Sequence, residues 1–178
     1  MLFAFSCDSD LDQLEKSFEV EGRIPDSYYT NFNITYSDSG MLKVKITGKE
    51  LEQFLKTDEA KGVDIMKDSV HVLFFNSDLV VSSELKADYA IRDHESQEMR
   101  AKGNVEVINK LGEKLNTERL TWYSQTKKII CDTTVVITKP NGLKIVGSSL
   151  ESDERFENYK IKKVRDSKIE FNREEAPE

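Results

Sequence analysis

The sequence predicts an all-β protein: a long, twisted antiparallel sheet that folds on itself around one apolar interior. Apolar residues recur at every second position from Tyr28 onward, and residues typical of turns separate the apolar runs. An internal repeat supports this prediction, because the segment from Val105 aligns with the segment from Val135 at an offset of 30 positions. Units of about 30–35 residues, each with one uncovered apolar face, stabilise one another by stacking.

Alternating segments and turns follow one another along the chain. The first two segments lie between residues 28 and 48 and are separated by a turn at Asp38-Ser39-Gly40. Gly112 and Asn141-Gly142 mark later turns, because Gly and Asn adopt positive φ at little cost. The segment 49–55, KELEQFL, is the one stretch that could form a short helix. The other strand-like segments are HVLFFN, DYAIRD, KGNVEVIN, TVVITKPNGLKIVG and KIEF.

A shorter signature, apolar-x-small-x-x-Leu, occurs four times. The apolar and small residues share one face of a strand, and the small residue leaves room for a facing layer. The step of three residues to Leu breaks the period of two and therefore predicts a bulge or bend. The four occurrences are Ile46-Gly48-Leu51, Val80-Ser82-Leu85, Leu115-Thr117-Leu120 and Ile145-Gly147-Leu150.

We expect the chain to divide into a lipoprotein-type N-terminus with a polar tether (1–24), a β domain (25–171) and a charged tail (172–178). Cys7 directly follows the apolar residues MLFAFS and precedes a polar stretch, as at the end of a bacterial lipoprotein signal. The apolar part is shorter than a complete signal, and Ala4 stands where Leu is usual. A start further upstream and a chance cysteine are the alternatives; lipidation of Cys7 is the interpretation that we favour.

Composition and motifs argue against several functional classes. The formal net charge is −7 and no basic stripe is present, so we expect no nucleic-acid partner. His71 and His94 lie far apart in the sequence, and neither belongs to a complete metal-binding motif. The sequence has no Gly-x-Ser-x-Gly, phosphate-binding loop or Rossmann fingerprint. We therefore expect no catalytic residue, no metal and no cofactor, and we expect Cys131 to be an inert buried thiol.

The second half of the chain carries a recognisable series of motifs: a Gly-Asn-Val strand, a turn ending in Gly, Leu-x-Thr-x-x-Leu, an aromatic residue and a closing Gly-x-x-Leu. The residues are Gly103, Asn104 and Val105; Gly112; Leu115, Thr117 and Leu120; Trp122; and Gly147 with Leu150. From about Leu85 to the end, the sequence resembles the LptC-type lipopolysaccharide export proteins, whose β-jellyroll is shared with LptA and the OstA-like domains. The likeness is looser over residues 25–84. Better-known members have an N-terminal transmembrane helix where this chain has Cys7.

The resemblance implies a single elongated antiparallel β-jellyroll with a role in outer membrane biogenesis. It implies a periplasmic protein at the inner membrane without a catalytic centre. The lipid anchor expected at Cys7 would hold the protein there. Such a protein accepts lipopolysaccharide from an inner-membrane ABC transporter of the LptF/LptG type and passes it to an LptA-like periplasmic protein. The acyl chains would lie against inward apolar residues. These are expected to be Val44, Ile46, Leu73, Ile91, Val105, Val107, Leu115, Val135, Ile137 and Ile145.

Both ends of the sheet are expected to dock partners by pairing of edge strands. Residues 159–171, YKIKKVRDSKIEF, are the last strand-like run before a charged tail with a proline. We therefore expect Ile161, Val164 and Ile169 at the edge that docks the LptA-like protein, and residues 28–36 at the transporter. An ordinary edge protected by its lysines is the alternative.

Two other functions are compatible with the residue pattern. One is a non-enzymatic scaffold or interaction module that joins partners edge to edge and binds no lipid. The other is a secreted β-sandwich enzyme or sugar-binding module. The inward apolar residues would form the core of any β-sandwich, so their pattern alone does not separate these functions.

Overall fold

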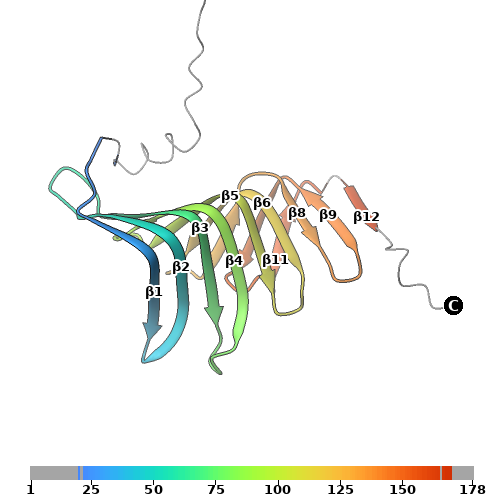
Figure 1. Cartoon of the computed structure of the whole chain (residues 1–178). Coiled ribbons are helices and arrows are strands. Elements are labelled where there is room, and N and C mark those ends of the chain that lie inside the picture. Colours follow the sequence, from blue (N-terminus) through green and yellow to red (C-terminus); the bar gives the residue numbers. More distant parts are fainter. Residues whose placement is uncertain (1–19, 21, 165, 170–178) are drawn as a thin grey trace, which may run out of the picture.

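The computed structural model describes residues 20, 22–164 and 166–169. None of these residues is helical, and their strands form one sheet in which every pairing is antiparallel (Figure 1). The all-β prediction is confirmed. The strands are β1 (Ser27–Asp38), β2 (Met41–Phe54), β3 (Val63–Phe75), β4 (Val81–Asp93), β5 (Glu98–Asn109), β6 (Lys114–Tyr123), β7 (Lys128–Cys131), β8 (Val135–Thr138), β9 (Leu143–Gly147), β10 (Ser149–Asp153), β11 (Tyr159–Lys162) and β12 (Asp166–Ile169).

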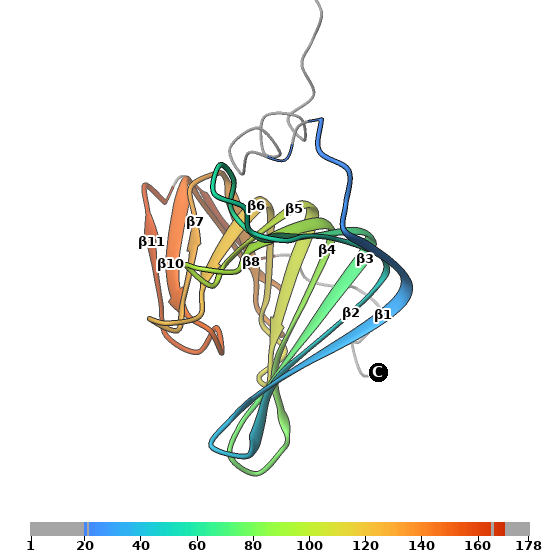
Figure 2. The ribbon, with the colours of Figure 1, turned by 90° about the vertical axis from the view of Figure 1, so that its left-hand side faces the viewer.

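The sheet forks at β6. Strands β1 to β6 pair in chain order. Beyond them, residues 121–123 of β6 pair with β7, whereas residues 114–117 of the same strand pair with β8. One branch continues as β7–β10–β11 and the other as β8–β9–β12, so that β1, β11 and β12 are the free edges of the described sheet. In Figure 2, β7, β10 and β11 form a layer apart from the long strands β1 to β3.

A crease crosses the long strands and divides the sheet into two walls. The pairing register shifts near the middle of each ladder from β2–β3 to β5–β6. Such bulges bend a strand, so the two halves of each long strand lie in different walls, as the curvature of β2 to β4 in Figure 1 illustrates. The first wall ends in the branch β8–β9–β12, and the second wall ends in β7–β10–β11.

Alternate strands cross this crease with backbone in the left-handed region. The residues concerned are Asn31 in β1 (φ 52°), residues 68–69 in β3 (φ 55° and 68°), and Gly103 and Asn104 in β5 (φ 75° and 47°). A Cβ at Gly103 would come within 2.8 Å of Oδ2 of Asp88. The Nδ2 group of Asn104 donates a hydrogen bond to the same oxygen at 2.7 Å. The Gly-Asn pair noted in the sequence therefore has a local cause, because both residues tolerate positive φ and both fit around the Asp88 carboxylate.

The bend predicted from the apolar-x-small-x-x-Leu signature is found at three of its four occurrences. Ile46-Gly48-Leu51 crosses the crease within β2, Leu115-Thr117-Leu120 crosses it within β6, and Ile145-Gly147-Leu150 spans the step from β9 to β10. Val80-Ser82-Leu85 is misplaced, because Val80 lies at the β3–β4 turn and is 59% exposed. Strand β4 crosses the crease at Leu85-Ala87-Ala90 instead.

Two rows of inward side chains form the interior. In the first wall each member pairs with the next across neighbouring strands: Ile34, Ile46, Val72, Leu85, Val107, Leu115, Ile137 and Ile145. The row of the second wall is Leu51, Met66, Ala90, Ala101, Leu120, Cys131, Leu150 and Ile161. Both rows belong to one core cluster, so the two walls pack face to face.

A smaller apolar cluster lies on the outer face of the second wall. It consists of Val20, Phe54, Val63, Ile65, Tyr89 and Ile91. The short helix considered for residues 49–55 is not formed, because β2 extends to Phe54. The outer cluster explains the apolar residue at the end of this strand. Leu51 faces the interior and Phe54 faces the outer cluster. Apolar residues three positions apart, one on each face of a strand, imitate the spacing of a helix.

Candidate functional site

The apolar interior between the walls is the first candidate site. Eight of the ten residues expected in the interior lie in or against the main core. Ile145 is half-buried, and the other seven are at most 4% exposed. Val107 and Ile137 are not paired with each other. Leu115 of β6 lies between them and pairs with both. The expected interior residues that lie in or against the main core are Val44, Ile46, Val105, Val107, Leu115, Val135, Ile137 and Ile145.

Two of the expected interior residues face the other way. Leu73 is half-buried and pairs with Lys45 and Glu84 on the outer face of the first wall. Its neighbours in the strand take the inward positions. Ile91 is buried, but it belongs to the outer cluster of the second wall. Both strands are apolar on both faces at these points, so alternation in the sequence could not tell one face from the other.

The seam is the line along which the turns of the first wall meet those of the second. The β10–β11 loop, residues 154–158, bridges it. Ser83 Oγ donates a hydrogen bond to the Glu154 carbonyl oxygen at 2.8 Å, and Asn109 Nδ2 donates to the Phe156 carbonyl oxygen at 2.8 Å. Lys110 Nζ lies 2.7 Å from a carboxylate oxygen of Glu157. Three contacts from the first wall therefore fasten this loop over the interior.

Phe156 anchors the loop. Its side chain is fully buried in the main core and stacks on Tyr159, with ring centroids 4.9 Å apart. The Asp153 carboxylate holds the turn, because it accepts hydrogen bonds from the backbone N–H groups of Arg155, Glu157 and Asn158. Burial raises the pKa of Asp153, but these hydrogen bonds to the charged form outweigh it and leave the pKa below its ordinary value.

Nearer the β1–β2 turn, aromatic contacts join the walls. The rings of Phe74 and Trp122 meet edge to face with centroids 5.1 Å apart. The Arg92 guanidinium lies 4.5 Å above the centre of the Tyr36 ring. Between these contacts and the β10–β11 loop is a pocket of about 190 Å³, which we call the seam pocket; Tyr36, Val44, Arg92, Trp122, Lys127 and Glu154 are among its lining residues.

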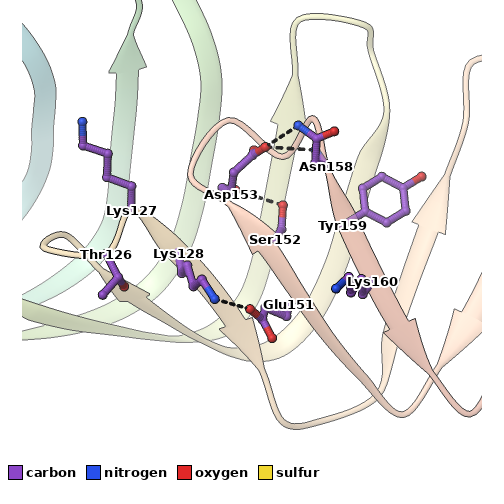
Figure 3. Close-up of a pocket in the computed structure, with 9 residues that line it drawn as sticks. All are labelled: Thr126, Lys127, Lys128, Glu151, Ser152, Asp153, Asn158, Tyr159 and Lys160. Carbon is purple, nitrogen blue, oxygen red and sulfur yellow. Dashed lines mark hydrogen bonds and ion pairs between the residues drawn. The ribbon is translucent and has the colours of Figure 1, made fainter.

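A larger hollow of about 470 Å³ lies beside the edge strand β11 (Figure 3). Lys127, Lys128 and Lys160 line it, but Lys128 is already paired with Glu151 at 2.5 Å. Asp153 and Asn158 close its upper end through their hydrogen bond, as Figure 3 shows. Polar and charged residues line the hollow, which lies next to the free edge and is separate from the apolar interior.

The expected partner edges lie at ends of the sheet, but the C-terminal run does not form a single edge: it is divided between β11 and β12, which end different branches. β1 pairs only with β2, β11 only with β10, and β12 only with β9 among the strands that the structure describes. Ile161 is half-buried and packs against the core from β11, whereas Val164 is 52% exposed between β11 and β12. The backbone of Ile169 lies in β12, and its side chain is outside what the structure describes. Cys7 also lies outside the described residues.

Sequence reasoning missed the elements of the seam. Phe156 lies in DERFEN, where one aromatic among charged residues gives no periodic signal. Tyr36 and Phe74 were part of strand-like runs, but their contacts with Arg92 and Trp122 depend on how the walls close. An isolated aromatic residue in a charged turn was the one signal that could have drawn attention to Phe156.

One folded antiparallel sheet, an enclosed apolar interior and free strands at both ends define an elongated β-jellyroll protein. The sequence matches the family described as "Lipopolysaccharide-assembly, LptC-related" over residues 5–167, and the chain belongs to this family. The resemblance carried by the Gly-Asn-Val and Leu-x-Thr-x-x-Leu motifs is thereby confirmed. No curated protein matches the chain. Membership makes this chain a component of lipopolysaccharide transport. Among the described residues, no helix is long and apolar enough to cross a membrane.

Proposed function

We propose that the chain accepts lipopolysaccharide from an inner-membrane ABC transporter of the LptF/LptG type and passes it to an LptA-like periplasmic protein. The observation that carries this proposal is the unbroken inward row from Ile34 in β1 to Ile145 in β9. The row runs from one free edge of the sheet to the strand beside the other. A continuous apolar path between two docking edges suits a carrier whose cargo has long hydrocarbon chains, and it requires no catalytic group.

Loading such a carrier exchanges contacts between the two walls for contacts with acyl chains. Each acyl CH₂ moved from water into an apolar interior contributes about 0.8 kcal/mol. The interior is closed, since residues such as Ile46 and Ile137 are fully buried. Acyl chains must therefore replace contacts between the two walls, and loading requires the walls to separate at the seam. The weak point is the loop 154–158, which is held by a few polar contacts and one aromatic side chain.

The membrane attachment that we propose is a diacylated Cys7. Two acyl chains on one residue give stable anchoring at a bilayer surface. The polar tether to the β domain would keep β1 near the membrane, where the transporter lies. Mass spectrometry of the mature protein tests this attachment directly. An unmodified Cys7, or a mature start beyond it, would contradict the proposal without affecting the role of the β domain.

Photocrosslinking tests the route of the lipid. A small diazirine amino acid at Ile137, which is fully buried, should capture lipopolysaccharide in cells that export it. The same amino acid at Ile130, which is 38% exposed on the adjoining branch, is the matched control and should capture none. Capture at both positions, or at neither, would contradict an interior route.

Crosslinkers at the edges test the partners. Tyr29 in β1 is 48% exposed, and Lys160 in β11 is exposed. We expect Tyr29 to capture the transporter and Lys160 the LptA-like protein, while Asp78 in the β3–β4 turn captures neither. Partner capture at the edges without lipid capture at Ile137 would favour the scaffold function instead.

A further inference from the structure

Two residues that line the seam pocket each carry a buried hydrogen-bond donor that has no partner among the described residues. Trp122 is 7% exposed, and its Nε1–H makes no hydrogen bond to any residue that the structure describes. The hydroxyl of Tyr36 is buried and likewise has no partner within the described part of the chain. Both residues line the pocket. Buried polar groups are normally paired, and an indole N–H can only donate, so the pocket is suited to a ligand that brings acceptor oxygens.

The charged residues of the pocket argue against a simple phosphate site. The Arg92 guanidinium donates hydrogen bonds to Asp64 at 3.2 Å and to Gln97 at 2.6 Å. Its face is covered by the Tyr36 ring. Arg92 is therefore already engaged, and the lysines that line the pocket are balanced in part by the carboxylates of Asp38 and Glu154. A free divalent anion would find little uncompensated positive charge here.

The pocket is apolar on its inner side and polar on its outer side. Val44 and Trp122 belong to the main core, and Trp122 meets Phe74 within it. Lys43 and Lys127 line the same pocket and carry the charges expected at a polar rim. A ligand that fits both sides has hydrocarbon at one end, a polar head at the other, and acceptor oxygens at the junction.

We propose that the seam pocket binds the ester or amide carbonyl oxygens that join an acyl chain to its sugar head. Trp122 Nε1–H and the Tyr36 hydroxyl donate to these oxygens, the chain enters the interior past Phe74, and the head stays between Lys43 and Lys127. The assignment rests on the proposed carrier function and deepens it, because it names the part of the lipid that the protein recognises at the opening of its interior.

Trp122 is the only tryptophan of the chain, so tryptophan fluorescence reports on the surroundings of this one side chain. Rough-form lipopolysaccharide should change the emission of Trp122 in a saturable way and reduce its quenching by acrylamide. The fully deacylated sugar phosphate prepared from the same material should leave the emission unchanged. Retention of radiolabelled lipopolysaccharide by the immobilised protein is measured in parallel and reports binding anywhere on the chain.

Tyr36→Phe removes one donor without breaking a hydrogen bond of the described structure, so the fold should be unaffected. We expect it to weaken lipopolysaccharide binding about five- to tenfold, the loss of one hydrogen bond. Tyr29→Phe, on an exposed tyrosine of the same strand, should change nothing. Retained lipopolysaccharide with unchanged Trp122 emission and full affinity in Tyr36→Phe would overturn the pocket and leave the carrier function standing. An equal response to the deacylated sugar would overturn the acyl-linkage assignment. No retention at all would overturn the carrier function itself, and the pocket with it.

Discussion

Gly147 of β9 lies directly beneath Ile161 of β11, and a Cβ at position 147 would come within 2.1 Å of Cγ2 of Ile161. The two strands belong to different branches of the sheet and are not paired with each other. The Lys162 carbonyl oxygen lies 3.2 Å from the same Cβ position. The absence of a side chain at Gly147 therefore lets the edge of the second wall close on the first, which is the role expected for the small residue of the signature.

Gly147→Ala should destabilise the protein by about 1–3 kcal/mol, because the added methyl group cannot be accommodated without moving Ile161. Urea unfolding followed by circular dichroism measures the change. Ile161→Ala removes the clashing methyl group, so the double variant should lose less stability than the sum of the single variants. Additive losses, or an unchanged midpoint for Gly147→Ala, would contradict the contact.

Ile137 should not tolerate a charge. It is fully buried and pairs with Leu115 and Ile145 in the inward row. Ile137→Ala should cost about 2–5 kcal/mol. Ile137→Asp should prevent folding, because an unpaired buried carboxylate costs more than the lost packing. Ile130→Asp, at the exposed outward position on β7, should stay within about 1 kcal/mol of the parent protein. Thermal unfolding of the three variants measures these stabilities. A folded Ile137→Asp variant with unchanged stability would refute the assignment of faces.

Asp153 should contribute stability that depends on pH. Its folded pKa is below the ordinary value of about 3.9, so its contribution is complete above that pH and is lost as pH falls through the folded pKa. Asp153→Asn should be less stable than the parent at pH 7, and the difference should shrink below about pH 4. Urea midpoints at pH 7, 5 and 3 measure this. Asp58→Asn, in the exposed β2–β3 loop, serves as the control. A difference that is constant with pH would show that the carboxylate charge does not matter.

Cys131 should be unreactive until the walls separate. Its side chain is fully buried, and burial raises its pKa to about 12. At pH 8 only about one thiol in ten thousand would then be a thiolate, the reactive form. In a Cys7→Ser variant, Cys131 is the only remaining cysteine. An aromatic disulfide reagent should therefore modify it only at the rate at which the interior opens, and modification at the rate of a free thiol would contradict this burial.

The alternating segments and the turns between them made an antiparallel sheet predictable from the sequence. The point at which β4 crosses the crease was not predictable, because the signature required Leu at its last position. In β4 that position is Ala90, which pairs with Met66 and Ala101. The match at Val80-Ser82-Leu85 was accidental.

The faces of Leu73 and Ile91 were not predictable from period alone. Each lies in a strand with apolar residues on both faces, so either face could be turned inward with an equally apolar result.

The contacts of the seam could not be predicted from the sequence for another reason. Phe156 lies in the core, and Ser83 and Asn109 of the other wall donate hydrogen bonds to the backbone of its loop. Such contacts join residues far apart in sequence and exist only once the sheet has folded over.

The fork at β6 gives the molecule two unlike ends. At one end, β1 is a single bent strand that belongs to both walls, whereas at the other end each wall finishes in its own short strand, β11 or β12. Two chains of this fold that meet end to end must therefore join the long strand of one to the pair of short strands of the other. Joining like ends would match one strand with one, or two with two, on surfaces that are not self-complementary. An assembly of such units therefore has a built-in polarity, because the long strand of each unit faces the two short strands of the next.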